Sequence, residues 1–238
     1  MKYFLDTEFL EGPQKRLIGH TKPTIDLISI AIVDETGKEF YAVSREFNLK
    51  EAWNRWQPRT GQGDRNNHEL REYWIRENVL RPIFDEFLAK YKSYYSYLPI
   101  SDEFCYRTMK FLLKEFGDDQ WYLALKVKNF INDAVFAKKD VDFYGYYADY
   151  DWVVFCWLFG TMMKLPEGFP WYCRDLKQIM AEKASSYKGW WMKNAKTPKE
   201  RLEMLQNHPK YPKQTNEHNA LADARWNLEL YKFLQLIP

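Results

Sequence analysis

Two acidic residues, Asp6 and Glu8, stand two positions apart in the largely apolar stretch 2–9. This stretch predicts a β-strand, in which alternate side chains share a face, so the two carboxylates project together about 7 Å apart. The two negative charges repel each other, and removing them from water is costly unless a cation neutralises them. Carboxylate oxygens are hard ligands that suit Mg²⁺ or Mn²⁺. An exposed edge strand whose acids face water explains this pair equally well, so both interpretations stay open here.

A third acidic candidate lies in mid-chain, where Asp149 and Asp151 follow the predicted strand 141–147. Two positions along a helix turn the side chain by about 200°, so only one of these acids can face a shared site. We interpret Asp149 as the N-cap of a helix and Asp151, inside that helix, as the metal ligand. The alternative for Asp151 is complementation of the helix dipole, worth about 0.3–1 kcal/mol.

The fourth element is the pair His218 and Asp223 near the C-terminus. Asn219 is a suitable N-cap, which puts Asp223 in the first turns of the last helix and His218 in the loop before it. Five positions on a helix would separate the two side chains by about 140°, so His218 must lie outside the helix to converge with Asp223. A histidine beside a metal cluster titrates near neutrality and is a natural general base.

Hydrophobic periodicity predicts the elements that position these residues. The predicted strands are 2–9, 24–33, 39–44 and 141–147. Helical periodicity covers about 68–92 and 103–133, with breaks near 97–99 and at Gly117, and further helices are predicted at 176–184, 198–205 and 219–234. The stretch 151–159 is apolar all round, which fits a buried strand or a buried helix, although the acids at its start favour a capped helix. The polar stretch 48–67 is interpreted as a surface loop. This order of elements predicts an α/β protein with a mixed sheet.

Composition narrows the function classes. The chain has 238 residues, a formal net charge of +2 and 18% aromatic residues, so any nucleic-acid binding depends on local patches rather than on the global field. Its three cysteines include no CxxC pair, which predicts reduced thiols. No apolar stretch approaches the roughly 18 residues of a membrane span, and the N-terminus lacks a signal-peptide pattern. We therefore expect a soluble, cytoplasmic protein.

Three motifs carry a family resemblance: DTEF at the N-terminus, YADYDWVVF in the middle and HNALADARWN near the C-terminus. Together they resemble the exonuclease motifs of the DEDDh superfamily of 3′→5′ exonucleases. The stretches YFLDTEF, TIDLISIAIVDETGKEFYAVSREF and YDWVVFCWLFG are more similar still to RNase AS-type exoribonucleases. The resemblance covers about 2–47, 141–184 and 217–234. It implies an RNase H-like fold with about five strands, in one domain whose core (about 1–47 and 141–238) carries a helical insertion at about 50–140.

The resemblance also implies residue roles in a two-metal mechanism with Mg²⁺ or Mn²⁺. Asp6 would bridge both cations, Glu8 and Asp223 would complete the site of the cation that activates water, and Asp151 would support the second cation. His218 would take the proton from the attacking water. The substrate implied is single-stranded RNA, cleaved from its 3′ end.

Substrate contacts are predicted in two places. We expect Thr7, Phe9 and Leu10 to contact the terminal nucleotides, although packing in the core explains Phe9 and Leu10 at least as well. The stretch 188–213 carries seven Lys or Arg against two Glu, together with two tryptophans, which suits an unpaired strand. Its candidate residues are Lys188, Trp190, Trp191 and Lys193. A solvated loop is the alternative, but its place before His218 favours a flap over the site.

Two rival functions stay open at this point. The same carboxylates would serve a DNA 3′→5′ exonuclease, because the motifs do not read the 2′-hydroxyl. A catalytically inactive nucleic-acid-binding protein of the same fold is the other, and the intact five-residue set argues against it. The sequence leaves the oligomeric state open, a homodimer included.

Overall fold

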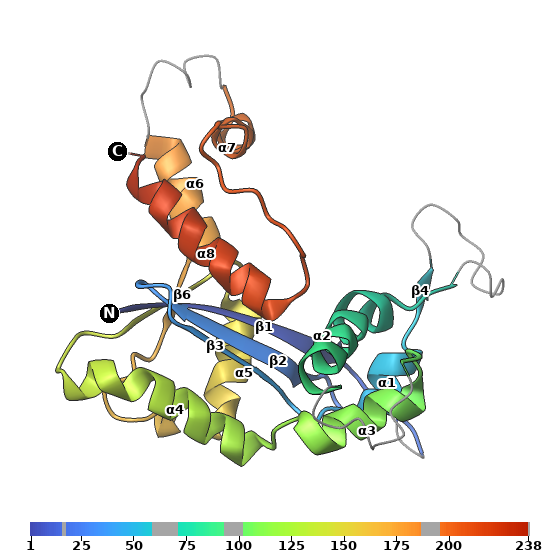
Figure 1. Cartoon of the computed structure of the whole chain (residues 1–238). Helices are drawn as coiled ribbons and strands as arrows, with labels where there is room; N and C mark the ends of the chain where they lie inside the picture. Colours follow the sequence, from blue (N-terminus) through green and yellow to red (C-terminus); the bar gives the residue numbers. More distant parts are fainter. Residues whose placement is uncertain (16–17, 59–70, 93–101, 187–195, 238) are drawn as a thin grey trace. The chain divides into compact units, whose positions relative to one another are not determined.

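The computed structural model of the chain describes residues 1–15, 18–58, 71–92, 102–186 and 196–237 (Figure 1). The chain divides into two compact units. The first unit comprises Met1–Thr7, Ile30–Tyr41 and Ala124–Pro238, and the second comprises Glu8–Ser29 and Ala42–Leu123. Among the described residues, no helix is both long and apolar enough to cross a membrane.

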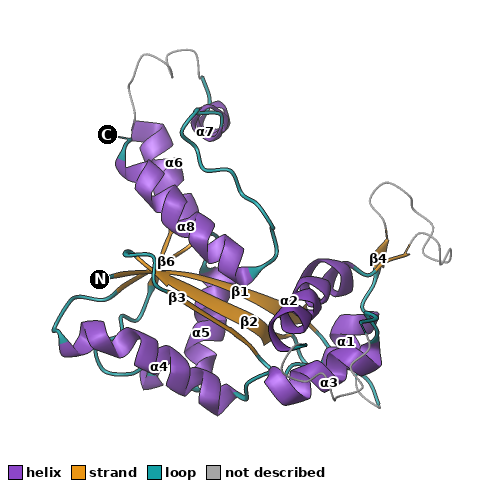
Figure 2. Cartoon of the chain, viewed as in Figure 1, coloured by secondary structure: helices purple, strands orange, loops and turns teal. Residues whose placement is uncertain are grey.

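The strands form a five-stranded mixed sheet with the order β3-β2-β1-β6-β7. Strands β1, β2, β3 and β6 are labelled in Figure 2. They are β1 (Lys2–Gly12), β2 (Thr24–Asp34), β3 (Glu39–Val43), β6 (Asp142–Gly145) and β7 (Cys173–Asp175). The short β2–β3 connection makes these neighbours an antiparallel hairpin, and Gly37 supplies the positive φ of 91° that its turn needs. Strand β6 pairs in parallel with both β1 and β7. This sheet confirms the predicted α/β class and places β1 in its middle.

Helices cover both faces of the sheet (Figure 2). They are α4 (Gln120–Phe136), α5 (Asp149–Leu158), α6 (Leu176–Ser186) and α8 (Ala220–Gln235). Side chains of β1 alternate between the faces, and Phe4 is buried in an apolar core with residues of α6 and α8. On the other face, the ring of Tyr3 lies 6.0 Å from that of Phe130 in α4. Next to it, Phe143 lies 4.9 Å from Phe155 in α5. This packing fixes α5 and α8, which carry candidate site residues, against β1 and β6.

Short elements and helices make up the second unit. They are α1 (Leu49–Asn54), β4 (Gln57–Pro58), β5 (Arg71–Glu72), the π-helix η2 (Arg76–Leu80), α2 (Arg81–Tyr91) and α3 (Tyr106–Phe116). Buried Leu80, Phe84, Met109 and Leu112 form the apolar interior of this unit. The described part of the predicted helix 68–92 is helical only after β5, as η2 and α2, and the predicted stretch 103–133 forms two helices, α3 and α4.

The structure differs from the predicted elements at three places. The stretch 48–67 is not all loop, because Asn48 caps α1 by accepting a hydrogen bond from the Glu51 N–H, 3.1 Å away. Strand β7 was not predicted, since three residues are too few to show an alternating pattern. The ambiguous stretch 151–159 is helix α5, and its N-cap is Ala148 rather than Asp149. Asp149 is exposed and makes no capping hydrogen bond in the first turn.

Candidate functional site

Three carboxylates meet beside the middle strand of the sheet. Asp6 and Glu8 lie two residues apart on β1, and Asp223 lies in the first turn of α8. Each offers a carboxylate oxygen, and these oxygens all lie within 4.8 Å of one another. Asp6 and Glu8 are half-buried, and Asp223 is 7% exposed. The structure therefore brings together three of the four acids that the sequence singled out.

Asp223 is held in place by two donors. The amide Nε2 of Gln214 donates to its Oδ1 at 2.6 Å, and the backbone N–H of His218 donates to its Oδ2 at 2.9 Å. Burial raises the pKa of Asp223 above its ordinary value, and the hydrogen bonds from Gln214 and His218 oppose that rise. Gln214 was not predicted, because a single glutamine in a polar segment carries no recognisable signal. A carboxylate of this kind gains from a nearby cation.

His218 lies outside α8, as the geometry of the helix requires. Its φ of 68° is in the left-handed region, and this turn of the chain aims the backbone N–H at Asp223. Asn219 caps the helix by accepting a hydrogen bond from the Ala222 N–H at 3.1 Å, which confirms the predicted cap. The electrostatic influence of His218 also lowers the pKa of Asp223. The histidine is half-buried beside the buried carboxylate.

Asn227 ties α8 to β1 and was missed by the sequence reasoning. It lies four residues, about one turn, after Asp223, and its Nδ2 donates to the Leu5 carbonyl at 3.0 Å. Asn227 is 1% exposed, and its Oδ1 has no hydrogen-bond partner among the residues that the structure describes. A buried amide that bonds the residue before Asp6 fixes the height of α8 along the strand. A signal existed: an asparagine on the buried face of a helix needs a polar partner.

Asp151 lies near β1 but is not one of the three clustered carboxylates. Its Oδ1 accepts hydrogen bonds from the Thr7 backbone N–H at 2.9 Å and the Thr7 hydroxyl at 2.6 Å. Burial raises the pKa of Asp151 to about 6, and the two bonds from Thr7 oppose the rise. Thr7, which lies between Asp6 and Glu8 on β1, therefore holds Asp151 in place.

The predicted substrate contacts divide into three groups. Leu10 is fully buried, so it belongs to the core, and Thr7 is 5% exposed with its hydroxyl engaged by Asp151. Burial of Leu10 agrees with its packing in the core, the alternative given for it above, and substrate contact by Thr7 stays a prediction. Phe9 is half-buried and lines a cavity of the second unit. The remaining four, Lys188, Trp190, Trp191 and Lys193, lie outside the described residues.

The mixed five-stranded sheet with flanking helices is consistent with an RNase H-like fold. The family model described as the 3′-5′ exoribonuclease Rv2179c-like domain matches residues 112–235, which is more than half of the chain. The chain therefore belongs to this family of 3′-5′ exoribonucleases.

Two curated relatives agree with the family. Each is 25% identical over 235 residues, which cover 98% of this chain and 93% of the relative. They are the 3′-5′ exoribonuclease MT2234.1 of Mycobacterium tuberculosis strain CDC 1551 / Oshkosh and the 3′-5′ exoribonuclease Rv2179c of strain ATCC 25618 / H37Rv. The similarity extends over nearly the full length, beyond the part that the family model matches.

Proposed function

We propose that this protein hydrolyses single-stranded RNA from its 3′ end with two divalent cations, as an exoribonuclease of the DEDDh type. One observation carries the proposal: a chain of a 3′-5′ exoribonuclease family gathers Asp6, Glu8 and Asp223 with carboxylate oxygens within 4.8 Å of one another. Membership of this family also favours the ribonuclease function over the two rival functions, a DNA exonuclease and an inactive nucleic-acid-binding protein.

The residues present fit a divalent cation. Three carboxylates at this separation repel one another, and burial already raises the pKa of Asp223. Mg²⁺ and Mn²⁺ take oxygen ligands, and Asp6, Glu8 and Asp223 offer only these. When bound, a pair of such cations stabilises the attacking and leaving oxygens of an in-line displacement at phosphorus. Asp151 is the further proposed ligand, held beside β1 by Thr7.

His218 is the proposed general base. A water molecule attacks the terminal phosphodiester, and the bond from phosphorus to the 3′-oxygen of the preceding nucleotide breaks. The 3′-oxygen takes up a proton from solvent to become the 3′-hydroxyl of the shortened strand, and the terminal nucleotide is released as a nucleoside 5′-monophosphate. His218 takes the proton from the attacking water. The backbone N–H of the same residue holds Asp223, so base and carboxylate are positioned by one residue. The positive φ of His218 directs its backbone N–H toward Asp223.

The preference for unpaired RNA gives a direct test of substrate class. We expect initial rates on single-stranded RNA to exceed those on DNA of the same sequence by roughly 10–100-fold, the value of one hydrogen bond to a charged group. Glu8, or a backbone group beside it, is the nearest candidate to read the 2′-hydroxyl. Rates on oligonucleotides labelled at either end, and on a blunt RNA duplex, complete the comparison.

Direction and strandedness are read from the same gels. Release of mononucleotides from the 3′ end, with the duplex attacked more slowly, supports the proposal. Equal rates on RNA and DNA would remove the ribonucleotide preference, and faster attack on the duplex would remove the preference for single strands.

We expect Asp151 to be required for activity and to lower the free energy of unfolding of the metal-free protein at neutral pH. Burial raises its folded pKa to about 6, above the ordinary value of 3.8, so its protonated form is favoured in the folded protein. The resulting stability is complete below about pH 4 and is lost as the pH rises through 6. At pH 7, metal-free Asp151→Asn should therefore exceed wild type in free energy of unfolding by on the order of 1–3 kcal/mol, while losing roughly 10²-fold or more in turnover.

Urea denaturation in EDTA at pH 4 and pH 7, together with rates in Mg²⁺, measures both effects. Asp149→Asn is the matched control: Asp149 is exposed on the same helix and should keep most activity and its stability profile. Full activity in Asp151→Asn, or a larger loss in Asp149→Asn, would show that the wrong acid was assigned.

A further inference from the structure

The second unit contains a cavity of about 360 Å³, and its lining begins on β1 at the residue directly after Glu8. Phe9, the residue after Glu8, lines it together with Trp56 and Trp74. We propose that this cavity binds an unpaired nucleobase of the RNA strand, a few nucleotides from the 3′ end. The inference rests on the proposed exoribonuclease function and adds a place for the substrate away from the reacting phosphate.

Three aromatic side chains give the cavity its affinity for a flat ring. Phe9, Trp56 and Trp74 are each half-buried, so they combine a fixed position with surface open to the cavity. Stacking of a base on an aromatic side chain is worth about 1–3 kcal/mol and tolerates any base. The cavity volume is within the range of about 300–1,000 Å³ that is usual for small-ligand pockets.

Trp56 is fixed by its neighbours. The guanidinium carbon of Arg71 lies 4.4 Å from the centre of the Trp56 ring, a cation–π contact. Arg71 belongs to β5, which pairs with β4 directly after Trp56, with Pro58 opposite Arg71 and Gln57 opposite Glu72. The small hairpin thus brings both Arg71 and the cavity residue Glu72 to the tryptophan. A ring held in this way loses little freedom when a base stacks on it.

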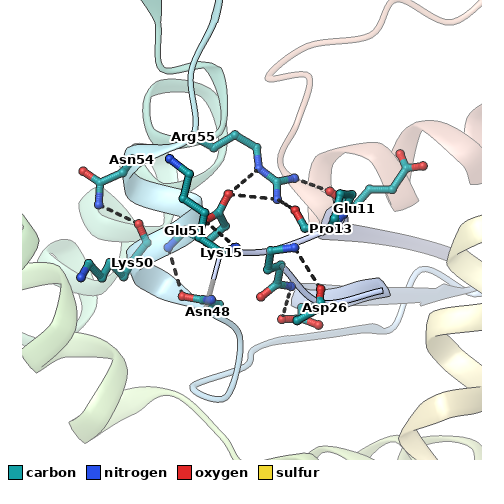
Figure 3. A network of polar contacts seen from close by, with 11 residues as sticks. Glu11, Pro13, Lys15, Asp26, Asn48, Lys50, Glu51, Asn54 and Arg55 are labelled. Atoms are coloured by element: carbon teal, nitrogen blue, oxygen red, sulfur yellow. Dashed lines mark hydrogen bonds and ion pairs between the residues drawn. The ribbon is translucent and has the colours of Figure 1, made fainter. Parts of the chain in front are cut away.

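The charges of the cavity favour a base over a phosphate. Arg55 lines the cavity, but its guanidinium is already bonded to Glu51, at 3.2 Å, and to the carbonyl oxygens of Glu11 and Pro13 (Figure 3). Two acidic residues, Glu11 and Glu72, are also among the lining residues. A phosphate group in the cavity would lie near these two acidic residues. The guanidinium of Arg55 is already bonded to other groups and would not offset their negative charge. An uncharged base meets no such repulsion, and its N–H groups can donate to the carboxylates.

Position along β1 sets which nucleotide is bound. Phe9 and Glu11 lie one and three residues after Glu8, and a strand rises about 3.3 Å per residue, so the cavity begins within roughly 10 Å of this acid measured along the strand axis, with the side chains of Phe9 and Glu11 on the strand face opposite to that of Glu8. We therefore expect the bound base to lie inward of the terminal nucleotide, at a position that the length of RNA between the two faces sets.

An abasic scan tests the proposal on the full-length protein. KM and kcat are measured for a labelled single-stranded RNA in Mg²⁺, with one abasic nucleotide moved stepwise from the 3′ end. Wild type should show one position, internal to the terminal nucleotide, where the missing base raises KM by roughly 5–100-fold with kcat little changed. Trp56→Leu should raise KM for intact RNA by a similar factor and show no further penalty at that position.

Two further variants distinguish loss of the base site from a folding defect. Trp56→Phe keeps an aromatic ring and should restore most of the wild-type KM, which a purely structural defect would not predict. Trp121→Ala removes a tryptophan that is 73% exposed on α4 and should leave the abasic profile unchanged. The same abasic profile in wild type and Trp56→Leu would overturn the base site while leaving the exoribonuclease intact. A wild-type protein without hydrolysis would overturn the proposed function, and the base site with it.

Discussion

Asp6→Asn is expected to reduce turnover on single-stranded RNA by roughly 10³-fold or more. Asp6 shares the site with Glu8 and Asp223, and loss of one charged ligand removes several kcal/mol of the stabilisation that bound cations provide. The amide keeps the size of the side chain and leaves the strand unchanged. Single-turnover rates at saturating RNA and a range of Mn²⁺ concentrations measure the loss, together with a shift to higher metal requirement.

Asp133→Asn provides the matched control. The side chain of Asp133 is 84% exposed, and its carboxylate pairs with Lys38 at 3.6 Å on the surface, so its loss should change turnover by less than about twofold. Turnover by Asp6→Asn within a few-fold of wild type would place the metal-binding residues elsewhere in the chain.

His218→Ala should lower the rate by roughly 10²–10⁴-fold, the usual contribution of a general base. The backbone N–H that holds Asp223 remains in this variant, so metal affinity should be nearly unchanged. Rates across pH and calorimetric titration with Mn²⁺ separate the two effects, because loss of the base removes the corresponding limb of the pH profile.

His20→Ala is the control for this variant, since His20 is exposed. It should retain wild-type rates across pH. If His218→Ala weakened metal binding as much as Asp6→Asn does, the histidine would be a metal ligand rather than the base.

Features with a local physical signature were predictable from the sequence. The alternation around Asp6 and Glu8 placed both acids on one strand, and the three-carboxylate group confirms that they converge with Asp223. The N-cap at Asn219 followed from its side chain, which accepts from the helix as expected. The two strands that form the hairpin, predicted at 24–33 and 39–44, followed from their β-branched and aromatic residues.

Features that depend on tertiary contacts were not predictable. Gln214 and Asn227 act through partners nine and 222 residues away in the chain, and neither belongs to a motif. Strand β7 has three residues, and pairing with β6 rather than propensity defines it. Asp149 was misread as an N-cap because a cap depends on backbone angles, and Ala148 takes that position.

Asp151 shows the limit most clearly. Helix geometry separated it correctly from Asp149, since one acid is buried and the other exposed. Its hydrogen bonds to Thr7 could not be inferred, because they join residues 144 positions apart. Its role as a ligand stays a prediction.

Metal dependence of RNA hydrolysis tests the central claim most directly. The wild-type protein is freed of metal with EDTA, and 5′-labelled single-stranded RNA is followed before and after Mg²⁺ or Mn²⁺ is added back. The carboxylate cluster predicts no shortening from the 3′ end in chelator and full recovery with either cation, whereas Asp6→Asn stays inactive at the same cation concentration. Hydrolysis by the wild-type protein that survives complete chelation would contradict the account.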